Sequence, residues 1–90
     1  MKIKDGYVLR EVAGSNIVVP VGNAQVSFSG IMTLNDVGTF IWRMLESENG
    51  ASREEIIDAV LGEYDAEAET VEKDVDRFII KLRAQHLIED

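Results

Sequence analysis

The 90-residue chain has no cysteine, a single proline and a single histidine. The lack of cysteine excludes disulfides, thiolate nucleophiles and thiolate metal sites, and it suits the reducing cytoplasm. The longest apolar run, residues 17–21, contains Pro20 and is far shorter than the roughly 20 residues of a membrane-spanning helix. The amino terminus has no apolar stretch of the kind that marks a secretory signal. We therefore expect a cytoplasmic protein without a membrane partner.

Groups that commonly carry catalysis are also scarce. His86 lies close to the chain end, and no thiol or glycine-rich phosphate loop accompanies it. Ser15, Ser27 and Ser29 have the surroundings of turn and strand residues. The sequence therefore predicts no catalytic residue, and a structural or solvent-exposed role for His86.

One acidic segment, residues 65–70, imitates the alternating carboxylates of a calcium-binding loop. Such a loop has glycine at its sixth position and glutamate at its twelfth, but Thr70 and Asp76 stand there instead. Carboxylates at the start of a helix also oppose its positive end, which explains the segment without a ligand. We therefore predict no metal site and no cofactor.

Basic residues are few in the middle of the chain, and the formal net charge is −8. The twelve carboxylates between Glu46 and Asp76 are opposed only by Arg53 and Lys73, whereas charges in residues 1–34 nearly balance. Proteins bind nucleic acids and anionic membranes mainly by neutralising phosphates with Lys and Arg. The charge distribution therefore argues against both as partners.

Ninety residues, of which 46% are hydrophobic and 29% charged, have the size and composition of one small globular domain. No repeat, low-complexity segment or linker divides them. We therefore expect residues 1–90 to form a single domain.

The first third of the chain reads as strands joined by turns. Residues 7–12, 17–19 and 25–28 are rich in β-branched and aromatic side chains, and turn-forming residues separate them at 13–16 and 20–23. This pattern predicts a three-stranded antiparallel sheet.

The predicted third strand has the features of an open edge. Val26 and Phe28 alternate with Ser27 and Ser29, and residues 23–33 contain no charge and no proline. Charged residues and proline are the usual features that prevent an edge strand from pairing with an incoming strand. The strand is therefore a candidate for pairing with a peptide, or with a second copy in a homodimer.

From residue 35 the apolar period becomes helical. We expect a first helix, capped by Asn35 or Thr33, that ends near residues 48–50. A capping box at residues 52–55 starts a second helix, and a third, capped by Asp65 or Thr70, runs to about residue 85. The apolar stripe of the third helix consists of Val71, Val75, Phe78, Ile79 and Leu82.

Three further residues have specific expectations. Trp42 is predicted to anchor the core, because large aromatic side chains dominate small cores. Gly38 inside the first helix costs about 1 kcal/mol relative to alanine, which indicates a close packing approach there. Ile80 falls on the far side of the third helix, where it is either a solitary exposed residue or a contact beside a binding groove.

A basic stripe follows the third helix, where Lys73, Arg77 and Lys81 lie four residues apart and adjoin Asp74. Two interpretations are open. In the first, Arg77, Lys81 and Arg83 complement the negative end of the helix, while Glu69 pairs with Lys73. Alternatively, the stripe recognises an acidic peptide.

The order of several segments resembles the family of pyrroloquinoline quinone biosynthesis protein D (PqqD). Residues 8–22 look like its amino-terminal hairpin, and residues 74–82 are similar to its last-helix pattern. Between them, residues 30–42 look like its leucine-asparagine, glycine, tryptophan signature, which is Leu34-Asn35, Gly38 and Trp42 here. The resemblance covers nearly the whole chain.

This resemblance implies an α+β, winged-helix-like domain of three strands followed by three helices. It implies a RiPP recognition element, a non-catalytic peptide chaperone that binds the leader of a ribosomally made precursor by strand addition and presents it to a modifying enzyme, often a radical SAM enzyme. Any iron–sulfur cluster would belong to that enzyme. The leader pairs with the third strand and lies against the third helix. The predicted peptide-binding residues are Val26, Ser27, Phe28, Ser29, Asp74, Arg77, Phe78 and Lys81.

A winged-helix DNA-binding transcription regulator is the alternative function, since it shares this architecture. The acidic charge of the chain disfavours it.

Overall fold

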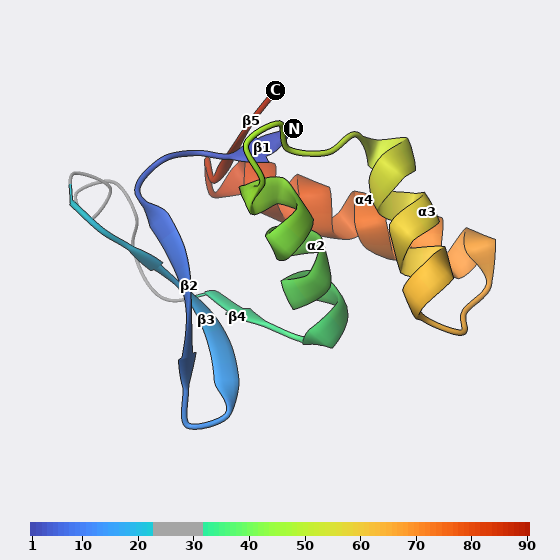
Figure 1. The fold of residues 1–90 in the computed structure, drawn as a ribbon, viewed down its shortest axis with the longest axis horizontal. Helices are drawn as coiled ribbons and strands as arrows, with labels where there is room; N and C mark the ends of the chain where they lie inside the picture. The colour runs from blue at the N-terminus through green and yellow to red at the C-terminus, as the bar shows by residue number, and fades with distance from the viewer. Residues whose placement is uncertain (23–31) are drawn as a thin grey trace.

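A computed structural model describes residues 1–22 and 32–90 of the chain. Its described part contains a three-stranded antiparallel sheet followed by three helices, which confirms the predicted α+β class (Figure 1). The strands of this sheet lie in the order β2, β3, β4, and a separate pair joins β1 to β5. The elements are β1 (Lys2–Ile3), β2 (Tyr7–Val12), β3 (Ser15–Pro20), β4 (Met32–Leu34), α2 (Asp36–Glu46), α3 (Arg53–Glu63), α4 (Ala68–Ala84) and β5 (Ile88–Glu89).

The hairpin of β2 and β3 is closed by two residues, Ala13 and Gly14, with φ angles of 51° and 81°. Positive φ at both central residues is typical of the turns whose twist matches that of the flanking strands. Ser15 therefore already pairs with Val12, and β3 begins two residues earlier than the sequence predicts.

β4 is the third strand of the described sheet, and it lies directly before α2. It pairs with β3 through Thr33 opposite Ile17, flanked by two further pairs. Met32 and Leu34 point into the core and are each 6% exposed, whereas Thr33 faces solvent. The strand predicted at residues 25–28 lies outside the described residues, as do Val26, Ser27, Phe28 and Ser29 of the predicted site, so these remain predictions.

Two of the three helix starts are as predicted. The Asn35 side chain accepts a 2.8 Å hydrogen bond from Gly38 N, and Ser52 forms a reciprocal capping box with Glu55.

The expected cap of α4 is wrong: neither Asp65 nor Thr70 caps this helix, because its N-cap is Glu67, which makes no side-chain cap hydrogen bond. Packing explains the difference. Val71 is buried, and its amide bonds to Glu67 O at 3.0 Å, so the helix begins one turn before its first buried side chain.

The core lies where the three helices meet the inner face of the sheet and the paired chain ends. Trp42 is fully buried there, which confirms its predicted anchoring role. Its indole nitrogen donates to Glu46 Oε1 at 2.5 Å, so the polar edge of the ring is satisfied. The other largest fully buried side chains are Ile41, Leu45, Ile56, Leu82, Leu87, Val18 and Val75. None of the described helices is long and apolar enough to cross a membrane.

The pairing of the two chain ends was not predicted from the sequence. Ile3 lies opposite Ile88, and Lys4 N donates to Leu87 O at 2.9 Å. Both side chains of the Ile pair are buried. Each strand has only two residues, which is too short for an alternating pattern to stand out.

α4 ends in a Schellman motif built around His86. This residue has a φ of 59°, and its amide bonds to Arg83 O at 3.0 Å. Leu87 N bonds to Leu82 O at 3.0 Å, and both leucines are fully buried. His86 therefore has a structural role, one of the two that the sequence predicts for it, in a conformation that favours glycine.

We predict that His86→Gly stabilises the protein by about 1 kcal/mol, because glycine adopts the left-handed conformation without the steric cost of a Cβ. The melting temperature should rise by about 5 °C. Gln85→Gly is the matched control. Gln85 has a φ of −93°, which any residue adopts, so glycine there should lower the stability of the protein. A fall in stability with His86→Gly would contradict this explanation of the helix end.

Candidate functional site

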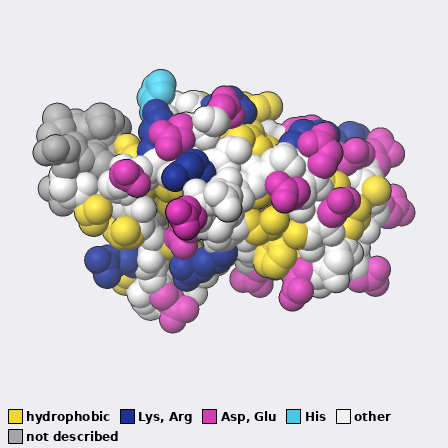
Figure 2. Space-filling view, turned by 45° about the horizontal axis from the view of Figure 1, so that its top comes forward, with side chains coloured by type: hydrophobic (Ala, Val, Ile, Leu, Met, Phe, Trp, Pro, Cys, Tyr) yellow, Lys and Arg dark blue, Asp and Glu magenta, His cyan; other side chains and the backbone are white. Residues whose placement is uncertain are grey.

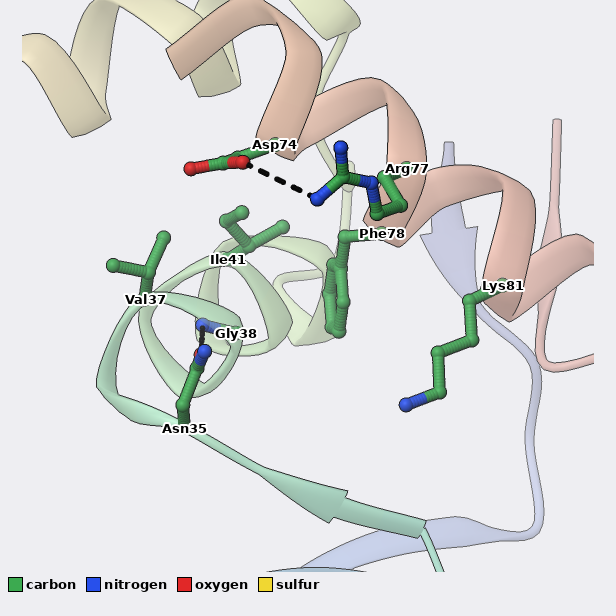
Figure 3. Close-up of a pocket in the computed structure, with 8 residues that line it drawn as sticks. All are labelled: Asn35, Val37, Gly38, Ile41, Asp74, Arg77, Phe78 and Lys81. Atoms are coloured by element: carbon green, nitrogen blue, oxygen red, sulfur yellow. Dashed lines mark hydrogen bonds and ion pairs between the residues drawn. The ribbon is translucent and has the colours of Figure 1, made fainter. Parts of the chain in front are cut away.

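A surface hollow of about 280 Å³ lies between the first turns of α2 and the middle of α4 (Figure 3). We call it the α2–α4 hollow. Its lining combines apolar side chains at the bottom with charged side chains along α4. The lining residues are Asn35, Val37, Gly38, Ile41, Asp74, Arg77, Phe78 and Lys81.

The α2 side of the hollow depends on the glycine at position 38, which has no Cβ. A Cβ on Gly38 would lie 3.3 Å from Phe78 Cε1 and 3.2 Å from Asn35 Oδ1, which is tighter than ordinary contact. Because glycine occupies this position, the Phe78 ring packs against the backbone of α2 while Asn35 still caps the helix. This confirms the close packing approach that the sequence predicts at Gly38.

The α4 side follows from helical spacing. Asp74, Arg77, Phe78 and Lys81 are separated by three or four residues, so they share one face of the helix. All four predicted site residues of α4 therefore line the same hollow. Figure 3 shows them in chain order along the helix, with Asp74 at one end of the hollow and Lys81 at the other.

The cations of the basic stripe differ in their partners. Lys73 Nζ lies 3.4 Å from Glu69 Oε1, the pair that the helix interpretation predicts, and Lys73 does not line the hollow. Arg77 Nη1 lies 3.8 Å from Asp74 Oδ1, and both side chains are more than half exposed, so this pair is loose. Lys81 has no ion-pair partner within the described part of the chain.

An edge strand borders the same region. β4 pairs with β3 alone among the described strands, so it is an edge strand of the described sheet. Figures 1 and 3 both show β4 and α4 running in roughly opposite directions. β4 leads directly into Asn35, which Figure 3 shows at the end of the hollow away from Lys81, so the carboxyl end of β4 lies at the Asp74 end.

The opposite side of α4 holds a second hollow of about 380 Å³. Arg53 of α3 donates two hydrogen bonds to Asp76 of α4 there, at 2.6 and 3.0 Å. The Arg53 guanidinium lowers the pKa of Asp76 below its usual value, chiefly through this hydrogen bond. Ile80, which is 67% exposed, lines this second hollow and not the α2–α4 hollow.

Acidic side chains dominate the surface near α3. Figure 2 shows them gathered over α3 and the beginning of α4. Among the described residues, no group of three or more His, Asp or Glu side chains is arranged to hold a metal ion.

Comparison with known proteins identifies the family of the chain. Residues 7–88 match the sequence family described as Coenzyme PQQ synthesis protein D (PqqD). The chain belongs to this family. This confirms the resemblance found in the sequence.

One solved structure extends the match to almost the full chain. It is described as TbiB1 in complex with the TbiA(beta) leader peptide, and it superimposes with a TM-score of 0.75 at 31% sequence identity. The alignment covers 99% of this chain and 95% of that one. No curated protein sequence matches the chain.

The α2 lining of the hollow was missed by the sequence analysis. Asn35, Gly38 and Ile41 follow one another at three-residue spacing, so they were recognisable as one face of a helix. Nothing in a single sequence indicates that this face meets Phe78 of α4, because the contact depends on how the two helices pack.

We predict that Asp76→Asn lowers the melting temperature at pH 7, because the Arg53–Asp76 contact holds α3 against α4. A lowered pKa in the folded state adds stability above the ordinary aspartate pKa of about 3.9. That stability is lost as the pH falls through the lowered pKa. Thermal unfolding should therefore show a difference from the wild type at pH 7 that shrinks steadily below about pH 4.

Asp58→Asn is the matched control for this experiment. Asp58 is exposed on α3 and makes no ion pair within the described residues. Its replacement should therefore change the melting temperature little, both at pH 7 and below about pH 4. An Asp76→Asn difference that persists undiminished at pH 2 would contradict an electrostatic origin.

Proposed function

We propose that this protein is a non-catalytic peptide chaperone, which binds the leader segment of a ribosomally synthesised precursor peptide and presents it to a modifying enzyme. Membership of the PqqD family supports the proposal. So does the match along almost the whole chain to TbiB1, whose structure is described as a complex with a leader peptide.

The geometry suggests how the leader binds. An extended peptide adds a strand to a sheet by pairing with exposed main-chain groups at an edge, and pockets beside the edge select its side chains. β4 supplies such an edge, and the α2–α4 hollow lies beside it. We therefore place the added strand between β4 and α4. Main-chain contacts from Val26, Ser27, Phe28 and Ser29 remain a prediction outside the described residues.

Different parts of the hollow have different roles in this proposal. Phe78, Val37 and Ile41 form an apolar surface that receives a hydrophobic side chain of the leader. Asp74, Arg77 and Lys81 supply charge selectivity, and Lys81 is the cation best placed to bind a leader carboxylate because it has no partner within the described residues.

The proposal includes the partner enzyme, the cellular compartment and the oligomeric state of the protein. The modifying partner is a peptide-modifying enzyme, for which a radical SAM enzyme is our first choice. Its cofactors belong to the partner, since this chain has no cysteine to ligate an iron–sulfur cluster. We place the complex in the cytoplasm. A homodimer formed through the β4 edge would compete with the leader for the same main-chain groups.

The observation that carries the proposal is the combination of the β4 edge and the α2–α4 hollow. The four α4 residues predicted from the sequence line this hollow. Their spacing puts them on one face of the helix, but the hollow itself arises from the packing of α4 against α2.

Replacing Phe78 tests the proposed site. Phe78→Ala should weaken binding of the leader encoded by the neighbouring precursor gene by about tenfold or more, because it removes the apolar surface of the hollow. Titration calorimetry measures the change. Ile80→Ala is the matched control on the same helix, and it should leave the affinity unchanged because Ile80 lies on the opposite side.

Circular dichroism of both variants checks that they remain folded, and Phe78→Leu provides a milder change if Phe78→Ala unfolds. The proposed site is wrong if Ile80→Ala weakens binding while Phe78→Ala or Phe78→Leu does not.

A further inference from the structure

The α2–α4 hollow has different charges at its two ends. Asp74 lies at one end and Lys81 at the other (Figure 3). We infer that the α2–α4 hollow selects leaders by the order of their side chains: a basic residue, then an apolar residue, then a carboxylate, at alternate positions from the amino to the carboxyl end. This inference rests on the proposed function.

The direction of the leader follows from the directions of the two elements. β4, which leads into the lining residue Asn35, and α4 run in roughly opposite directions (Figures 1 and 3). All strand pairs in the described structure are antiparallel, and antiparallel pairing is the more stable mode for each residue. A leader that adds antiparallel to β4 therefore runs parallel to α4. Its amino end lies near Asp74 and its carboxyl end near Lys81.

The Asp74 end is the more acidic one. Asp74 lines the hollow here, and its one ion pair among the described residues is the loose contact with Arg77. A basic leader residue is therefore favoured at this end and an acidic one disfavoured.

The Lys81 end has the opposite preference. Lys81 is exposed, lines the hollow and has no carboxylate partner within the described residues. A leader carboxylate near its ammonium group would form a new ion pair without breaking an existing one, whereas Arg77 already has Asp74. Lys81 is thus the specificity-determining cation of the hollow.

The spacing of the three leader residues follows from the rise of the two elements. From Asp74 to Lys81 is seven residues of helix, or about 10 Å at 1.5 Å per residue. A strand rises about 3.3 Å per residue, and only alternate side chains face α4. Positions i and i+4 of the leader are therefore about 13 Å apart, close to the separation of Asp74 and Lys81 along α4, and flexible side chains absorb the difference. Position i+2 lies over Phe78.

A peptide-display selection on the full-length protein tests this order. The probe is a library of random peptides about 12 residues long, enough to span the α2–α4 hollow as a strand. We expect the selected peptides to carry a carboxylate two residues after an apolar anchor and Lys or Arg two residues before it. Selection of the reverse order, or of no order, would overturn the inference while leaving peptide binding intact. Failure to select any peptide would overturn the proposed function as well.

Variants of α4 identify the cation responsible. With Lys81→Glu, the selected peptides should lose the carboxylate or replace it with a basic residue. Lys73→Glu is the matched control, because Lys73 pairs with Glu69 and lies outside the hollow, and its selection should match that of the wild type. A loss of the carboxylate preference with Lys73→Glu but not with Lys81→Glu would overturn the assignment.

A pair of synthetic peptides gives the magnitude. One carries a selected sequence, and the other has the same composition with its basic and acidic positions exchanged. We expect the exchange to weaken binding by about tenfold, since it replaces two exposed attractions by two repulsions. The difference should shrink at high salt. Equal affinities at low salt would overturn the inference.

Discussion

The contact between Phe78 and the backbone of α2 at Gly38 is the constraint on which the proposed site depends. Any side chain at position 38 would lie within 3.3 Å of the Phe78 ring, so glycine allows α4 to pack this close to the first turn of α2. The same turn follows β4 directly, and the Asn35 cap holds it in place. One close approach therefore determines both the apolar surface of the hollow and the position of α4 relative to the sheet edge.

A second set of contacts holds α4 from its other side. Arg53 joins it to α3 through Asp76, and the Schellman motif at His86 leads the chain into the β1–β5 pair. α4 is thus fixed along most of its length, while its hollow-facing side chains remain accessible. Such preorganisation favours binding, because little conformational entropy is lost when an extended guest is added.

Much of this arrangement was predictable from local patterns. The hairpin, the Asn35 cap and the capping box at Ser52 each depend on a few neighbouring residues, and so does the shared face of Asp74, Arg77, Phe78 and Lys81. The α4 cap was not predictable in this way, because burial of Val71 overrides the capping preferences of Asp65 and Thr70. The β1–β5 pair joins residues almost a whole chain apart, and no local pattern reports such a contact.

The strand that borders the hollow shows the same limit. Met32, Thr33 and Leu34 are too few to form a recognisable strand pattern, and β4 becomes visible only through its pairing with β3. Amide hydrogen exchange at these three residues, with and without the leader peptide, tests the central claim most directly. Strand addition at the β4 edge predicts that exchange slows at those of the three amides that point away from β3. Unchanged exchange at all three residues in the saturated complex would contradict the account.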